Sequence, residues 1–148
     1  MLTETEIRYI RIVYEFEEKG VPLVGPQDIA NVLNVSRASA HESLVRLVRK
    51  GYLEHFPRKG FRLSKIGKCV AKRIIRNHRI LETMLVKIVG LSVDEACECA
   101  SGIELKISLA IIEKIYDKLG NPQCCPHGKP IPPIENECEE VQVKCAPK

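Results

Sequence analysis

The sequence predicts a mainly α-helical protein with one small β-hairpin, arranged as two helical domains. Three observations support this fold class. Residues 26–50 have the pattern of two helices joined by a tight turn. Two short strand-like runs follow and meet at Pro57-Arg58-Lys59-Gly60. From residue 64 to residue 119, apolar residues recur at helical spacing.

The segment 26–50 is typical of a helix-turn-helix. Pro26 suits the first turn of a helix, where its missing N–H would have no partner anyway, and the apolar residues of 29–33 form one stripe. Asn34-Val35 forms the turn, and Ser36 is placed to cap the second helix. With the basic hairpin as a wing, the sequence predicts an N-terminal winged helix-turn-helix.

The exposed start of the second helix is the expected reading surface for DNA. The predicted inward side is Ala40, Leu44, Leu47 and Val48, and the predicted outward side is Arg37, Ala38, Ser39, His41 and Ser43. Small polar and basic residues at this position fit a major groove. We expect Arg37, Ser39 and His41 to read base edges. Ala38 is close enough for a contact with a thymine methyl group.

The charge distribution also favours a polyanionic partner. Residues 36–79 contain thirteen basic residues and two acidic ones, a local net charge of +11 in a chain whose total is +4. Such an asymmetry indicates polyanion binding, although a solvated basic face is the alternative. Together with the helix-turn-helix it predicts double-stranded DNA as the partner. The expected phosphate contacts are Arg46, Arg49, Arg58, Lys59 and Arg62.

Length and composition are those of a globular protein with one medium or two small domains. The chain has 148 residues, 45% hydrophobic and 28% charged, and no apolar run approaches the ~20 residues of a membrane span. The acidic N-terminus MLTETEIRYI does not resemble a signal peptide. We therefore expect a cytoplasmic protein that does not enter the membrane. Its seven cysteines cannot all pair within one chain.

Three regions are predicted: a winged-helix domain over 1–63, a helical dimerisation and metal-binding domain over 64–134, and a cysteine-containing tail over 135–148. Ser64 is expected to cap a helix that runs to about Val89, with an apolar face of Ile66, Val70, Ile74, Leu81, Leu85 and Ile88. A further helix is predicted over 102–119, and it is apolar on more than one face. Burial within one subunit is one solution. We favour contact with a second copy, which predicts a homodimer on a palindromic operator.

A second group of residues has the chemistry of a metal site. His78 and Glu82 are four residues apart, so both project from one helix face. The thiols and imidazole that accompany them are Cys97, Cys99, Cys124, Cys125 and His127. Thiolate, imidazole and carboxylate together suit Fe²⁺, Zn²⁺, Co²⁺ or Ni²⁺ rather than Mg²⁺ or Ca²⁺. Because Cys97 and Cys99 cannot face the same side of a helix, one of them is expected to be a buried core thiol.

The order of these elements resembles a known family. The chain has a winged helix, then NHRILETML, a short helix and CPHGKPIP. From Tyr9 to Pro133, this order is similar to that of the diphtheria toxin repressor and manganese transport regulator family. The resemblance implies a dimeric, metal-dependent transcription factor for operators of metal-uptake and related genes. It also implies the short, two-domain form, without the SH3-like third domain of the longer members.

The resemblance implies metal ligands at the family's ancillary site, whereas the family's regulatory site is poorly matched in this sequence. His78 and Glu82 fall on the family's ancillary ligands, and Cys97 falls where the iron branch has a histidine. Cys125 and His127 match the CPHG ligands of some members. The regulatory site matches poorly, because Arg8 and Arg11 stand at its N-terminal positions and, of Ser101, Glu104 and Leu105, only Glu104 keeps a ligand. We therefore expect metal sensing at the cluster of His78, Glu82, Cys97, Cys125 and His127.

A guanidinium repels a metal ion, so Arg8 is expected to pair with Glu104 and tie the two domains together without metal. A thiol in the cluster favours Fe²⁺ or Zn²⁺ over Mn²⁺. The sequence thus predicts a metal-dependent transcriptional regulator, a repressor by resemblance. The alternative is a regulator of the same fold that senses redox state or an iron–sulfur cluster through its cysteines, including Cys138 and Cys145. An enzyme is not expected, because nothing completes a catalytic site around Cys125 and His127.

Overall fold

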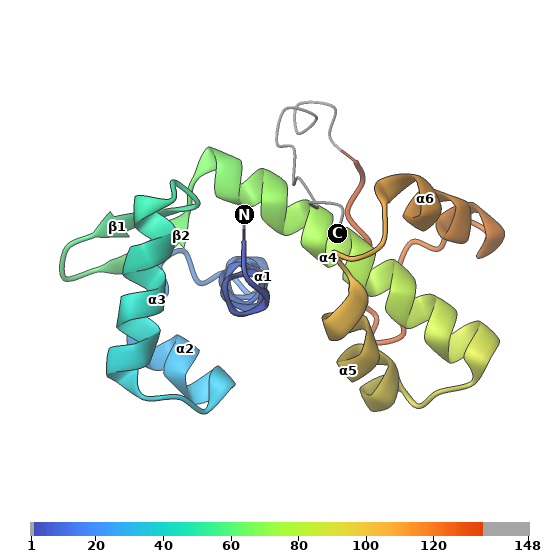
Figure 1. The fold of residues 1–148 in the computed structure, drawn as a ribbon, viewed down its shortest axis with the longest axis horizontal. Coiled ribbons are helices and arrows are strands. Elements are labelled where there is room, and N and C mark those ends of the chain that lie inside the picture. Colours follow the sequence, from blue (N-terminus) through green and yellow to red (C-terminus); the bar gives the residue numbers. More distant parts are fainter. Residues whose placement is uncertain (1, 135–148) are drawn as a thin grey trace. The chain divides into compact units, whose positions relative to one another are not determined.

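The computed structural model describes residues 2–134, which are mainly helical and contain one β-hairpin (Figure 1). The elements are α1 (Glu4–Glu18), α2 (Pro26–Leu33), α3 (Arg37–Arg49), β1 (Leu53–Phe56), β2 (Gly60–Leu63), α4 (Lys65–Met84), the π-helical turn η1 (Leu85–Val89), α5 (Val93–Ile103) and α6 (Leu109–Lys118). Among the described residues there are two compact units, 2–71 and 72–134. The predicted tail 135–148, with Cys138 and Cys145, lies outside the described residues.

The helix-turn-helix forms as predicted. Pro26 opens α2, and Asn34 makes the turn with a left-handed φ of 53°. Ser36 caps α3 by accepting a hydrogen bond from the Ser39 amide at 3.1 Å. Ile29 of α2 and Leu44 of α3 are fully buried, so the two helices share the core of the first unit.

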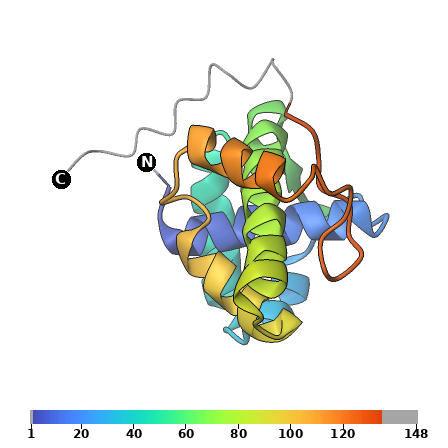
Figure 2. The ribbon, with the colours of Figure 1, turned by 90° about the vertical axis from the view of Figure 1, so that its right-hand side faces the viewer.

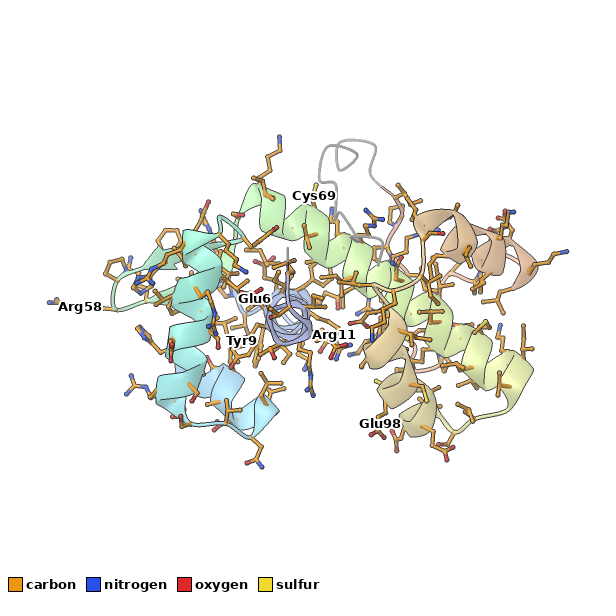
Figure 3. All side chains as sticks on the ribbon, in the orientation of Figure 1. Glu6, Tyr9, Arg11, Arg58, Cys69 and Glu98 are labelled. Atoms are coloured by element: carbon orange, nitrogen blue, oxygen red, sulfur yellow. The ribbon has the colours of Figure 1, made fainter. Side chains whose placement is uncertain are left out.

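The hairpin forms an antiparallel pair in which Leu53 faces Leu63 and Phe56 faces Gly60. Gly60 has a φ of +133°, and a Cβ at this position would lie 2.8 Å from the carbonyl oxygen of Val24. Only glycine allows that close approach. Arg58 lies at the tip of the hairpin and points away from it (Figure 3).

Helix α4 begins in the first unit and continues through the second. Ser64 caps it, accepting a hydrogen bond from the Gly67 amide at 3.0 Å, as predicted. Two residues of the predicted apolar face are wrong, however, because Ile66 is 52% exposed and Ile88 is 67% exposed. None of the described helices is long and apolar enough to cross a membrane.

The second unit is built around the C-terminal part of α4. Its core joins α4, α5, α6 and the segment that follows them, through the buried residues Ile80, Leu81, Ala100, Ile112 and Ile131. Helices α5 and α6 lie beside α4 in this unit (Figure 2). The core therefore fixes the positions of the three segments that carry the candidate metal ligands.

The predicted single helix over 102–119 is wrong. Helix α5 extends to Ile103, and α6 begins only at Leu109. In a continuous helix the carbonyl oxygen of Glu104 would accept the amide of Ser108. Instead it accepts a hydrogen bond from the side chain of Asn77 at 2.9 Å. The Asn77 side chain of α4 thus donates to a backbone carbonyl that would accept an intrahelical hydrogen bond if the predicted helix were continuous.

Candidate metal centre and DNA-reading surface

The five predicted ligands of the cluster lie close together around Glu82. His78, Glu82 and Cys97 form one group of three, and Glu82, Cys125 and His127 form another. Within each group the ligand atoms lie within 4.8 Å of one another. Segments separated by up to 49 positions in the chain therefore converge on one carboxylate. We call these five residues the Glu82 cluster.

A carboxylate behind the ring orients His78. The Nδ1–H of His78 donates to Oε2 of Glu104 at 2.7 Å. A neutral imidazole with its proton on Nδ1 presents the lone pair of Nε2 to the other side. There Nε2 lies 3.5 Å from Sγ of Cys97 and 3.6 Å from Oε2 of Glu82. Glu104, predicted as a ligand, thus lies behind His78 as its hydrogen-bond partner.

A short loop brings the other thiol and imidazole to Glu82. The amide of Cys125 donates to the Lys129 carbonyl at 2.9 Å, and the Gly128 amide returns to the Cys125 carbonyl at 2.8 Å. This tight turn places His127 so that its Nδ1–H donates to Oε1 of Glu82.

Two buried arginines fasten the loop to α4. Arg79 donates to the Pro130 carbonyl at 2.5 Å, and Arg76 donates to the Pro132 carbonyl at 2.8 Å. Both are among the thirteen basic residues counted over 36–79, yet Arg79 is only 2% exposed and Arg76 only 5%. Their neighbours Ile75 and Ile80 are buried as well, and that flanking is the sequence signal that could have identified them.

Arg76 also joins α4 to α6. Burial alone would lower its pKa, but hydrogen bonds to Glu113 raise it above its ordinary value. The guanidinium binds both oxygens of Glu113, at 3.0 and 2.9 Å, and lies over the ring of Tyr116. A fully paired buried cation of this kind stabilises the contact without leaving an unsatisfied charge.

The Glu82 cluster is buried on one side and open on the other. Glu82, His78 and Cys125 are almost inaccessible, whereas His127 is exposed. Cys97 is half-buried and Cys99 is exposed, so the prediction that one of these two is a buried core thiol is wrong. A small ion could reach the buried donors from the His127 side.

The predicted DNA-reading residues of α3 are exposed, with one exception. Arg37, Ala38, Ser39 and His41 all lie on the surface. Ser43, predicted to face outward, is only 7% exposed and accepts a hydrogen bond from Arg46 at 3.3 Å. The placement of Ser43 on the DNA-facing side is therefore wrong, because that position lies within the buried stripe of the helix.

On the wing, Arg58 and Lys59 are exposed at the turn. Arg62 pairs with Glu54 at 2.8 Å and lies over the ring of Phe56. These contacts hold its guanidinium at the surface of the hairpin. The wing therefore presents three cations, two of them at its tip.

A buried carboxylate holds the far end of α3 to α1. Glu6 caps α1 together with Thr3 and lies 2.8 Å from the ammonium of Lys50. Burial alone would raise the pKa of Glu6, but hydrogen bonds from Lys50 and Thr3 lower it below its ordinary value. The nearby Arg46, at 3.7 Å, is still half-exposed, so it remains available to a second anion.

Comparison with known families now places the chain. The domain described as "Iron dependent repressor, N-terminal DNA binding domain" matches residues 1–61. The domain described as "Iron dependent repressor, metal binding and dimerisation domain" matches residues 64–133. The chain belongs to the iron-dependent repressor family. This is a family of transcriptional regulators rather than enzymes.

Curated relatives and solved structures agree with this family. The iron-dependent repressor IdeR of Mycobacterium tuberculosis is 30% identical over 88% of the chain, and the diphtheria toxin repressor of Corynebacterium diphtheriae is 27% identical over 90%. The chain spans 56% and 59% of these relatives' lengths. A manganese-dependent transcriptional repressor in complex with manganese matches 86% of this chain and 58% of its own, with 32% identity and a TM-score of 0.78.

A hypothetical protein from Sulfolobus solfataricus is matched over its whole length and over 89% of this chain, with 29% identity and a TM-score of 0.67. The mainly helical fold with a two-stranded sheet, predicted from the sequence, is thus confirmed. The predicted ion pair of Arg8 and Glu104 would join the two units, and it stays a prediction.

Proposed function

We propose that the chain is a metal-dependent transcriptional repressor that acts in the cytoplasm and binds a palindromic operator as a homodimer. One observation carries the proposal: a partly buried, preoriented set of thiol, imidazole and carboxylate donors lies in the same chain as a winged helix-turn-helix. Two matched domains of the iron-dependent repressor family support this combination.

The metal would be held by the Glu82 cluster. A bound divalent ion supplies positive charge and fixed coordination bonds, which would tie together α4, α5 and the loop that carries Cys125. The side chains are suited to this because Glu104 fixes the ring of His78 and Arg79 fixes the loop. Fe²⁺ is favoured by the mixture of donors, and Zn²⁺, Mn²⁺, Co²⁺ and Ni²⁺ are alternatives.

The DNA would be read by α3 and held by the wing. Arg37, Ser39 and His41 are exposed at the start of α3, where a recognition helix meets base edges. His41 also lies edge-on to the ring of Phe61, with 6.1 Å between ring centroids. Phe61 belongs to β2, so this contact would keep the recognition helix and the wing in register on the duplex.

A second copy of the chain would cover the apolar surface of α6. Ile111 is 53% exposed although the adjacent Ile112 is fully buried, and Ile103 at the end of α5 is 37% exposed. Dimerisation was predicted from a single apolar helix over 102–119, which the structure does not contain. The exposed isoleucines still provide an apolar surface that a second copy would cover. The matched dimerisation domain supports it.

The proposal can be tested by measuring affinity for DNA selected from a random pool by the metal-loaded protein. Fluorescence anisotropy in the presence of Fe²⁺ under anaerobic conditions should show binding about 5- to 150-fold tighter than with a chelator, the usual range of coupling between two sites. Equal affinities in the two conditions would contradict metal dependence. Absence of any selected sequence would contradict the function as a DNA-binding regulator.

A further inference from the structure

We propose that Glu82 bridges two divalent transition-metal ions, one held by His78 and Cys97 and the other by Cys125 and His127. This inference rests on the proposed function, because it takes the Glu82 cluster to be a metal site. Its basis is that the five donors form two groups of three and that Glu82 belongs to both.

The two carboxylate oxygens of Glu82 face different groups. Oε2 lies 3.6 Å from Nε2 of His78. Oε1 accepts the hydrogen bond of His127. A carboxylate that serves one ion turns one or both oxygens toward that ion, whereas here each oxygen has its own imidazole. Two ions on opposite oxygens of one carboxylate would be about 3.5–4 Å apart, the spacing of two-metal sites.

The first group already has the spacing of ligands around one ion. Metal–ligand bonds of about 2.0–2.3 Å at tetrahedral angles place nitrogen, oxygen and sulfur donors about 3.4–3.6 Å apart. Nε2 of His78 is 3.5 Å from Sγ of Cys97 and 3.6 Å from Oε2 of Glu82. An ion therefore fits this group without moving either pair, and it needs no donor from the loop.

In the second group, His127 and Glu82 are already joined by a hydrogen bond. An ion bound to both side chains would displace the proton of this hydrogen bond, as metal binding commonly does. Cys125 is buried beside them at 6% exposure, while His127 is open to solvent. The second ion can therefore enter from the solvent side while the first group keeps its arrangement.

Cobalt titration of the reduced 148-residue chain tests this inference. Thiolate-to-cobalt charge-transfer absorption reports only ions with a cysteine ligand, so ions bound elsewhere are silent. In anaerobic buffer, at protein concentrations above the dissociation constant, the absorption should rise to a break at two equivalents of Co²⁺. Cys97→Ser and Cys125→Ser should each reach only part of the wild-type absorption, because one of the two ions then has no thiolate ligand. The exposed neighbours provide matched controls, and Cys99→Ser and Cys124→Ser should still break at two.

The outcomes separate this inference from the proposed function. A wild-type break at one equivalent would overturn the bridge and leave a single-ion sensor. No charge-transfer absorption would overturn metal binding by the cluster itself. His127→Ala changes an exposed side chain and leaves the core intact, so it should fold and break at one equivalent. A break at two in this variant would overturn the assignment of the second ion.

Discussion

The candidate DNA contacts in residues 2–71 are exposed, and few of them are fixed by hydrogen bonds or ion pairs. By contrast, the candidate metal ligands in residues 72–134 are mostly buried and are held by hydrogen bonds. Arg37 and Arg58 lie on the surface. His78 and Glu82 are 5% and 1% exposed, and Glu104 orients the ring of His78. The difference follows from the partners. A polyanion is attracted by cations on an accessible surface, but a small ion needs donors already placed within a few tenths of an ångström.

The largest effect should come from the residue shared by both donor groups. Glu82→Ala removes one ligand from each group, so metal affinity should fall by more than the roughly 100-fold typical of losing an outer-shell partner. Competition with a chromogenic chelator measures this. Glu98→Ala, which changes an exposed carboxylate on α5, is the matched control and should keep wild-type affinity (Figure 3).

A smaller loss is expected from the carboxylate behind His78. Glu104→Gln keeps the size of the side chain but weakens the bond that fixes the Nδ1–H tautomer, so affinity should fall roughly 10- to 100-fold. The same competition assay applies. Unchanged affinity would mean that metal binding in residues 72–134 does not depend on a preoriented His78. That result would contradict the difference drawn between the metal ligands and the DNA contacts.

In residues 2–71, a substitution on α3 should change recognition of one part of the operator only. Arg37→Ala should reduce discrimination at one base step by about 1–3 kcal/mol while other positions of the operator keep their preferences. Binding to a panel of single-base operator variants measures this. A uniform loss across the panel would show that Arg37 contacts phosphate and that α3 docks in another register.

The smallest effect should come from the wing. Arg58→Ala should weaken binding to all sequences alike and reduce the slope of log affinity against log salt by about 0.9, one phosphate contact. Lys118→Ala, on α6 of the other unit, is the control and should leave the slope unchanged. An altered base preference in Arg58→Ala would place the wing tip against base edges.

The same contrast explains what could be predicted from the sequence. The helix-turn-helix depends on local signals, namely Pro26, the left-handed Asn34 and the Ser36 cap, and each has the predicted role. The break between α5 and α6 could not be predicted, because Asn77, 27 residues away, binds the Glu104 carbonyl. Tertiary contacts of this kind override helical spacing.

The candidate metal ligands were predicted from residue chemistry and from the family resemblance, but the residues that support them were not. Arg76 and Arg79 look like part of a basic surface in the sequence, yet they bind the carbonyls of Pro132 and Pro130 inside the protein. Ser43 was misplaced in the same direction, because it was expected to face DNA and is buried. A local pattern indicates the type of a residue, while its partner is determined by the packing of distant segments.

The central claim is that metal bound at the Glu82 cluster controls the winged helix. It is tested most directly by the ratio of operator affinities with and without Fe²⁺, measured for wild type, His78→Ala and Cys97→Ala under anaerobic conditions. We expect wild type to bind its operator about 5- to 150-fold more tightly with Fe²⁺ than without it. Both variants should give a ratio near one, with metal-free affinity unchanged. Full metal content and a wild-type ratio in both variants would contradict it.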